Sequence, residues 1–208
     1  MAVKDPPGRV EETVMHPLAT PAEKVTALAA RFTTGGFAHA FGGAVALSAH
    51  AGPCALPRID LHVFSAPRDA DAVLARLAVL GLDMDRAEMR QRVAIRGHVE
   101  LAWGPTPLGV SFGLDGLHAL ARPRVRRVPF DTRWIYVLSA EDLVLASALA
   151  SPGGGRAELE GLVAALGGDL ALDYVRRSLV QLGAHAPIPA LERVISARAL
   201  GNAAPLVS

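Results

Sequence analysis

The amino-acid sequence predicts an α/β fold, in which a small mixed β-sheet with flanking helices is followed by a helical C-terminal region. Short segments in which apolar and polar residues alternate, such as RIDLHVF at 58–64, are typical of strands and are interspersed with amphipathic runs typical of helices. From Ser139 onwards only helical patterns remain. A chain of 208 residues, 51% of them hydrophobic, is long enough to bury the core of such a fold.

The sequence divides into three parts. Residues 1–18 are polar and contain several prolines, so we expect a flexible leader. Residues 19–138 carry the mixed pattern and form the predicted α/β domain, and residues 139–200 form the predicted helical region. Thr20 and Glu23 have the spacing of a capping box, in which each side chain accepts a hydrogen bond from the other residue's backbone amide.

The individual elements are predicted from periodicity and from the residues that bound each segment. The predicted strands are 37–41, 58–64, 91–96, 98–103, 124–130 and 134–138. The predicted helices are 21–34, 44–50, 69–82, 114–121, 143–150, 156–166, 172–182 and 191–200. A turn at Gly97 is expected to join 91–96 to 98–103 as a hairpin, and the basic cluster at 123–127 is interpreted as the solvated face of a strand.

The composition argues against several classes of protein. A net charge of +1 provides no strong field for nucleic acid or membranes, so neither is expected as a partner. The single cysteine, Cys54, excludes an intramolecular disulfide. The N-terminal residues lack the apolar core of a secretory signal, and no apolar run approaches the ~18 residues that a spanning helix needs. We therefore expect a soluble cytoplasmic protein.

Three polar residues share one face of the predicted strand 58–64. Arg58, Asp60 and His62 lie two residues apart, and side chains at that spacing point to the same side of a sheet. If the strand that carries Glu100 is a neighbour, Asp60 and Glu100 converge, as carboxylates do where they hold Mg²⁺ against nucleotide phosphates. The alternative interpretation is a half-solvated strand in which these residues form an ion pair that orders the sheet.

A glycine pair, Gly42-Gly43, separates a predicted strand from a predicted helix. Glycines allow a phosphate to approach the backbone and the N-terminus of the following helix, although such a pair is also a common turn. Four histidines lack the spacing of metal ligands and are interpreted as structural: His39, His50, His98 and His118. Cys54 has no spaced histidine or aspartate and is not expected to act as a nucleophile.

The order of these motifs resembles that of the minimal nucleotidyltransferases of the AbiEii and MNT type, in the DNA polymerase β-like superfamily. In that family a Gly-Gly or Gly-Ser turn leads into an apolar helix and then a strand of the form R-x-T-x-D-I-D-L. A later strand carries a third carboxylate, and a helix begins S-P-E-D-L. The corresponding segments here are GG, ALSAHAG, CALPRIDLHVF, VELAWGPTPLG and SAEDLVLASALA, within residues 20–185. The resemblance implies a nucleotidyltransferase fold, a nucleotide substrate and Mg²⁺.

Residue by residue, the resemblance places Asp60 on the family's second metal-binding aspartate and Glu100 on its third carboxylate. These two would be the catalytic residues and would hold any bound metal. Arg58 falls where the family has its first aspartate. The nucleotide-binding residues would be Gly42, Gly43, Arg58 and His62. The other departures are Cys54 at the arginine of the motif, Leu56 at the threonine and Ser147 at the lysine common in active relatives.

An arginine in place of an aspartate reverses the sign of one charge and brings a guanidinium to a site where a metal would lie. We therefore interpret Arg58 as a built-in counter-ion of Asp60 and Glu100. The resulting pocket would bind a nucleotide or other phosphorylated ligand, with nucleotidyl transfer impaired or lost. Two alternatives stay open: an active Mg²⁺-dependent nucleotidyltransferase, and a non-catalytic interaction module that binds a partner protein in a toxin–antitoxin-like system.

Overall fold

A six-stranded mixed β-sheet organises the residues that the computed structural model describes, which are 20–113, 116–150, 156–167 and 170–202. The strands are β1 (His39–Phe41), β2 (Ile59–Val63), β3 (His98–Leu101), β4 (Leu108–Phe112), β5 (Arg126–Phe130) and β6 (Arg133–Val137). Their order in the sheet is β3-β4-β2-β1-β6-β5. The β1–β6 and β2–β4 pairs are parallel, and the other three pairs are antiparallel. The predicted α/β fold with a mixed sheet is confirmed.

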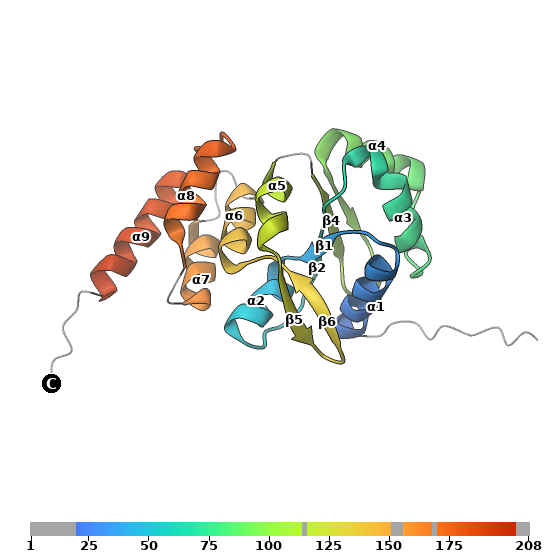
Figure 1. The fold of residues 1–208 in the computed structure, drawn as a ribbon, viewed down its shortest axis with the longest axis horizontal. Helices are drawn as coiled ribbons and strands as arrows, with labels where there is room; N and C mark the ends of the chain where they lie inside the picture. The colour runs from blue at the N-terminus through green and yellow to red at the C-terminus, as the bar shows by residue number, and fades with distance from the viewer. Residues whose placement is uncertain (1–19, 114–115, 151–155, 168–169, 203–208) are drawn as a thin grey trace, which may run out of the picture.

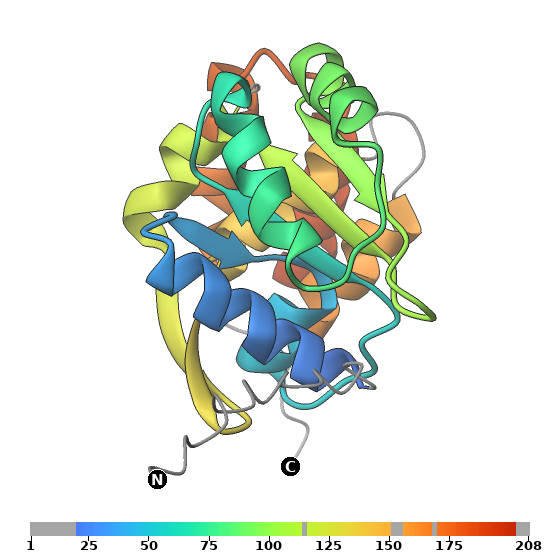
Figure 2. The same cartoon turned by 90° about the vertical axis from the view of Figure 1, so that its right-hand side faces the viewer.

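Helices cover both faces of the sheet (Figure 1). The helices are α1 (Pro21–Thr34), α2 (Gly43–Ala51), α3 (Ala70–Ala78), α4 (Arg86–Arg96), α5 (Leu117–Ala121), α6 (Ala140–Ala150), α7 (Arg156–Leu166), α8 (Leu172–Gln181) and α9 (Ile188–Asn202), with 3₁₀ turns η1 (Pro67–Asp69) and η2 (Arg122–Arg124). Helices α1, α3 and α4 lie on one side, in front of the sheet in Figure 2, whereas α2, α5 and α6 lie on the other. Of these helices, none is both long and apolar enough to cross a bilayer.

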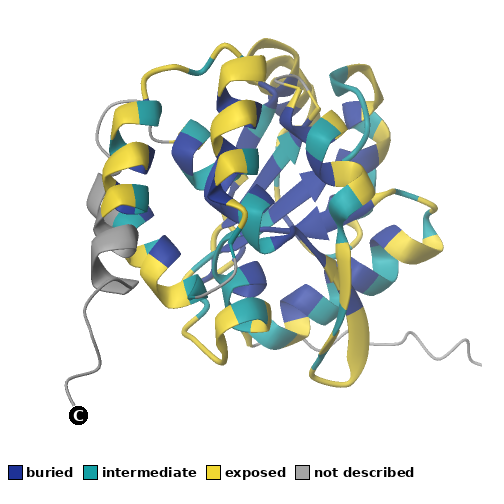
Figure 3. Ribbon diagram, turned by 60° about the vertical axis from the view of Figure 1, so that its left-hand side comes forward, coloured by how far each residue is buried: buried dark blue, intermediate teal, exposed yellow. Residues whose placement is uncertain are grey.

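The core forms where apolar strand residues meet α1, α3 and α4. Ile59, Leu61 and Val63 of β2 are fully buried and pack in one cluster with Val25 and Leu28 of α1. The central strands are accordingly buried in Figure 3, while the β5–β6 hairpin projects with much of its surface exposed. Because β2 alternates, the residues between these apolar positions point to the α2 side of the sheet.

The first helix begins as the sequence predicts. Thr20 accepts a hydrogen bond from the Glu23 amide at 3.2 Å, and Glu23 accepts one from the Thr20 amide at 2.9 Å. The helix ends at Thr34, and Gly36 takes a positive φ of 72° in the turn that follows. The predicted strand at 37–41 is present in shorter form as β1.

One predicted hairpin is wrong. Residues 91–96 belong to helix α4, which Asp85 caps by accepting hydrogen bonds from the amides of residues 87 and 88. Met89 and Val93, one helical turn apart, are its buried residues, and Ile95 is exposed on the other side. Val93 therefore belongs to a helical stripe with Met89, and its apparent alternation with Ile95 does not mark a strand. The partner of β3 is instead β4, which lies in a segment where the sequence predicts neither a strand nor a helix.

The C-terminal helices form a second apolar cluster, which includes Val144, Val175 and Leu179. The predicted boundary at residue 138 lies between the end of β6 and the start of α6. The helices predicted at 156–166, 172–182 and 191–200 are present as α7, α8 and α9. The predicted leader at 1–18 lies outside the described residues.

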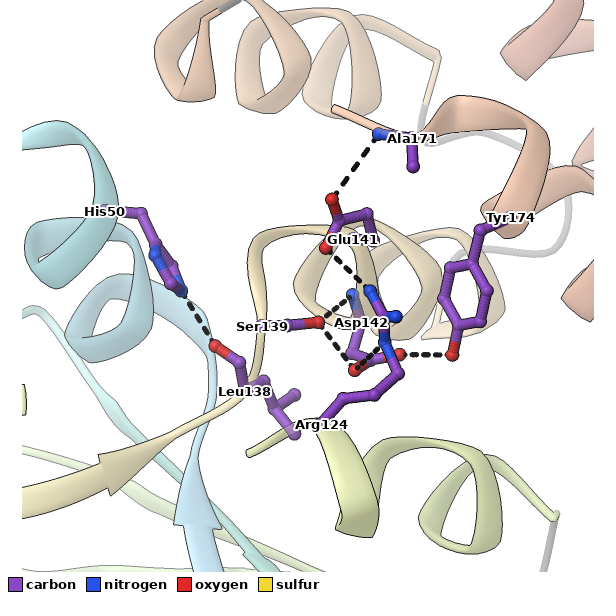
Figure 4. A network of polar contacts seen from close by, with 8 residues as sticks. All are labelled: His50, Arg124, Leu138, Ser139, Glu141, Asp142, Ala171 and Tyr174. Carbon is purple, nitrogen blue, oxygen red and sulfur yellow. Dashed lines mark hydrogen bonds and ion pairs between the residues drawn. The ribbon is translucent and has the colours of Figure 1, made fainter. Parts of the chain in front are cut away.

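A network of polar side chains joins α6 to η2 and α8 (Figure 4). The Asp142 carboxylate is fully buried; it accepts hydrogen bonds from Tyr174 at 2.7 Å and Ser139 at 2.6 Å. Arg124 forms ion pairs with Asp142 at 3.2 Å and with Glu141 at 2.8 Å. Burial, together with the bond to Asp142, raises the pKa of Tyr174 to about 12. The network therefore links the base of the β5–β6 hairpin to the C-terminal helices.

Replacing Asp142 tests how much this network stabilises the protein. Asp142→Ala leaves the Arg124 charge and the Tyr174 hydroxyl without their buried acceptor, so we expect the free energy of unfolding to fall by about 3 kcal/mol in urea denaturation. Glu192→Ala is the matched control because Glu192 pairs with Arg176 at 3.1 Å while 52% exposed. That variant should lose less than about 1 kcal/mol. Equal losses would show that the network adds nothing beyond a surface ion pair.

Candidate functional site

Polar residues from three adjacent strands form two rows on the α2 side of the sheet. Strand β4 lies between β2 and β3, and its register aligns residues across all three strands. The first row is Asp60, Gly109 and Glu100, and the second row is His62, Ser111 and His98. Asp60 and Glu100 were expected from the sequence to converge if their strands were neighbours. The strands are not neighbours, because β4 lies between β2 and β3.

Arg58 closes the distance between the two carboxylates. Its Nη2 lies 2.7 Å from Oδ1 of Asp60 and 2.8 Å from Oε1 of Glu100, and its Nε donates to the same Asp60 oxygen at 2.8 Å. Hydrogen bonds between ionised groups at these distances are short and comparatively strong. One edge of the guanidinium thus bridges Asp60 and Glu100. Its Nη1 makes no hydrogen bond within the described residues, and the side chain is 43% exposed.

Gly109 makes room for this bridge. A Cβ at Gly109 would lie 2.5 Å from Arg58 Nη2, 3.1 Å from Asp60 Oδ1 and 3.2 Å from Glu100 Oε1. The first distance is shorter than any real contact of a Cβ, so a side chain at this position would displace the guanidinium. The absence of a side chain in the middle strand is therefore what allows Arg58 to lie across it.

His98 extends the network to the second row. Its Nε2 donates to Glu100 Oε1 at 2.7 Å, and its Nδ1 lies 3.0 Å from the Ser111 hydroxyl. Burial by itself would raise the pKa of Glu100, but the hydrogen bonds from Arg58 and His98 outweigh it and lower that pKa. Burial likewise opposes the charge of Arg58, yet Glu100 and Asp60 raise its pKa overall. The arrangement therefore stabilises the charged forms of Arg58 and Glu100.

The glycine pair packs directly on this face. Gly42 donates its amide to the Asp60 carbonyl at 2.9 Å, and α2 begins at Gly43 without a side-chain cap. Gly43 has a φ of 49°, and a Cβ there would collide with the Asp60 carboxylate. A Cβ at Gly42 would lie 2.7 Å from His62 Nε2. Both positions therefore require glycine, because His62 and the Asp60 carboxylate pack against the backbone there. The N-terminus of α2 consequently lies beside Asp60.

His62 is the buried member of the site. Its Nδ1 lies 3.1 Å from Nε2 of His118, which α5 brings over the sheet. Burial, together with the neighbouring His118 and His98, lowers the pKa of His62 to about 3. The ring is therefore neutral at physiological pH, so it can offer a ligand a hydrogen bond but no positive charge.

The donor set does not fit Mg²⁺. This ion requires several oxygen ligands in near-octahedral geometry, and the two carboxylates here each pair with Arg58. Among the described residues, no group of three or more His, Cys, Asp or Glu side chains is arranged to hold a metal. A cation next to both carboxylates also repels a second cation electrostatically.

All six residues that the sequence singled out lie in this one region: Gly42, Gly43, Arg58, Asp60, His62 and Glu100. Sequence reasoning missed Gly109 and Ser111, and it treated His98 and His118 as structural only. The alternation in LGVSF at 108–112, where apolar residues flank Gly109 and Ser111, was the available signal for the missing strand. The prolines and glycines on either side of this segment are typical of loops, which is why the strand was not predicted.

Comparison with known proteins identifies no family. No protein-family model and no curated protein sequence matches the chain. Among solved structures, the chain is similar to the solution structure of the antibiotic-resistance factor ANT(2'')-Ia. The match has a TM-score of 0.48 and 14% sequence identity, and it covers 87% of this chain and 94% of that one. A likeness at this level transfers neither a residue role nor an activity.

Gly109→Ala should separate Arg58 from Glu100. Because the colliding atom is the end of a flexible side chain, the guanidinium moves and the fold is retained. We expect the pKa of Glu100 to rise in an NMR titration of the side-chain carboxyls, since its main hydrogen-bond donor is lost. Gly161→Ala is the control, as a Cβ there meets nothing within 4 Å. An unchanged Glu100 pKa in Gly109→Ala would contradict the bridging geometry.

His62 should make the protein less stable in acid. Its folded-state pKa of about 3 lies below the value of about 6.5 expected when unfolded, so only the unfolded state binds this proton between those values. Lowering the pH from 6 to 4 should therefore cost about 1.4 kcal/mol per unit in the free energy of unfolding. His62→Gln cannot titrate, and its urea-denaturation curves should show a correspondingly smaller slope with pH. Parallel slopes would argue against a buried neutral ring.

Proposed function

We propose that this chain is a nucleotidyltransferase-like protein that binds a nucleotide or another phosphorylated ligand and has lost metal-dependent nucleotidyl transfer. The observation that carries the proposal is the Arg58 bridge between Asp60 and Glu100. A guanidinium lies between the two carboxylates that the family resemblance assigns to metal binding.

The ligand would bind next to Asp60, which contacts Arg58 and lies beside the N-terminus of α2. Arg58 Nη1 remains free to donate a hydrogen bond, and the other edge of the guanidinium neutralises carboxylate charge that would repel a phosphate. The uncapped first turn of α2 provides backbone amides and the positive end of the helix dipole. Gly42 and Gly43 bring this backbone into close contact with His62 and the Asp60 carboxylate, so a ligand at the helix N-terminus would also lie beside these two side chains.

Loss of transfer follows from the same geometry. In metal-dependent transfer the ions neutralise the charge that develops on the phosphoryl group and activate the attacking hydroxyl. Arg58 neutralises charge, but a guanidinium does not lower the pKa of a coordinated hydroxyl as a metal does. His98 is the neighbouring base, yet its Nε2 is engaged by Glu100. We therefore expect binding without turnover.

Calorimetric titration of ATP, in Mg²⁺ or in EDTA, tests the proposal with the wild type and two variants. The wild type should bind ATP with similar affinity in both buffers and release no pyrophosphate. Arg58→Gln should weaken binding about tenfold because the donor to phosphate is lost. Arg58→Asp should bind ATP only with Mg²⁺, since it returns a third carboxylate to the site.

Arg86→Gln is the matched control, because Arg86 forms an exposed ion pair with Asp71 at 2.9 Å away from the proposed site. It should bind ATP as the wild type does. Binding by the wild type that requires Mg²⁺, with pyrophosphate release, would instead support an active nucleotidyltransferase. No ATP or other nucleoside triphosphate binding by the wild type or Arg58→Asp would overturn the proposal in favour of an interaction module.

A further inference from the structure

The β5–β6 hairpin presents aromatic and arginine side chains on one exposed face. Its register pairs Arg127 with Tyr136 and Pro129 with Trp134, so these four residues share a face, which we call the hairpin face. Trp134 is 57% exposed and Tyr136 is 38% exposed, whereas the alternate residue Ile135 is fully buried. The hairpin projects beyond the body of the molecule in Figure 3. Large exposed rings at such a position are unusual for a surface without a partner.

Positive charge accompanies these rings. Arg126, Arg127 and Arg133 are exposed and form no ion pair within the described residues, in contrast to Arg124, which pairs with two carboxylates of α6. Arg127 lies on the hairpin face, whereas the register places Arg126 and Arg133 on the opposite face of the hairpin. Asp131, in the turn, is the only carboxylate residue between positions 122 and 137. The net charge of the whole chain is only +1, which by itself does not indicate a polyanionic ligand. The fold concentrates unpaired positive charge locally.

The rings are held in place for stacking. The Arg127 guanidinium lies 5.0 Å from the centre of the Trp134 ring, within the range of a cation–π contact. Tyr136 makes an edge contact with His39, with ring centres 5.9 Å apart. Ordered rings lose little conformational entropy when a planar group stacks on them. A planar ligand group could therefore stack on either aromatic ring, next to the Arg127 guanidinium.

The exposed edge of the sheet at β5 is poorly suited to pairing with a peptide strand. Strand β5 is the last strand of the sheet, and an exposed edge can pair with a peptide strand through backbone hydrogen bonds. Pro129, in the middle of β5, has no N–H to donate and so interrupts that pairing. Recognition at this hairpin therefore depends on side chains, which here are cations and aromatic rings.

We propose that the hairpin face binds single-stranded nucleic acid. Arg127 contacts a backbone phosphate, and bases stack on Trp134 and Tyr136, while Arg126 and Arg133 on the opposite face of the hairpin add positive potential. Stacking platforms flanked by positive charge are how proteins bind single strands with little sequence preference. The proposal uses none of the residues assigned to the nucleotide site and does not depend on that assignment.

Fluorescence anisotropy with a fluorescein-labelled 20-nucleotide oligo-dT, with tryptophan emission recorded in parallel, tests the proposal. The wild type should bind, and its emission should be quenched, because Trp134 is exposed while the other tryptophan, Trp103, is buried. Trp134→Ala should weaken binding about tenfold, the size expected for one lost base stack. Arg127→Gln should reduce the salt dependence of log K by about 0.7, the value for one lost phosphate contact with a single strand.

The matched control is the double variant Arg90→Gln/Arg96→Gln, which removes two exposed arginines from α4. It has lost more positive charge than Arg127→Gln, yet its affinity should stay within twofold of the wild type. Trp134→Phe retains an aromatic ring and should keep most of the affinity, which separates lost stacking from lost folding. Binding without tryptophan quenching, or a control as weak as Arg127→Gln, would overturn the proposal. Equal competition by poly-glutamate would also overturn it and point to an acidic protein partner.

Discussion

The bridge from Arg58 to Asp60 and Glu100 is the interaction on which the polar face of the sheet depends. Two carboxylates facing the same side of a sheet repel each other unless a cation lies between them. Here that cation is the side chain of Arg58, the residue just before β2, so the two carboxylates need no ion from solution. The bridge spans three strands, and it requires the middle strand to offer no side chain at Gly109.

An internal cation and a metal ion differ in what they can do for a bound phosphate. Both neutralise negative charge, and a guanidinium also gives directed hydrogen bonds. Only a metal activates a coordinated hydroxyl and adapts its coordination as a reaction proceeds. In the proposed function, Arg58 would therefore help to recognise a phosphorylated ligand rather than to transform it. The buried neutral His62 and the glycine turn at α2 fit the same interpretation, since they shape the site without adding charge.

Polar contacts elsewhere in the molecule connect the polar face of the sheet to the β5–β6 hairpin. The network around Asp142 connects η2, which leads into β5, to α6 and α8. Next to this network, His50 at the end of α2 donates to the Leu138 carbonyl at 2.8 Å, just after β6. These hydrogen bonds and ion pairs have both partners in place and are at least partly buried, so they favour one arrangement of the elements.

Local features were predictable from the sequence because they depend on neighbours in the chain. The capping box at Thr20, the helix that starts after Ser139 and the shared face of Arg58 and Asp60 follow from caps and periodicity. Only the tertiary structure decided that Asp60 and Glu100 meet across Gly109, because strand order is set by contacts between residues far apart in the chain. The same reason explains α4, where the burial of Met89 and Val93 outweighs a short apparent alternation.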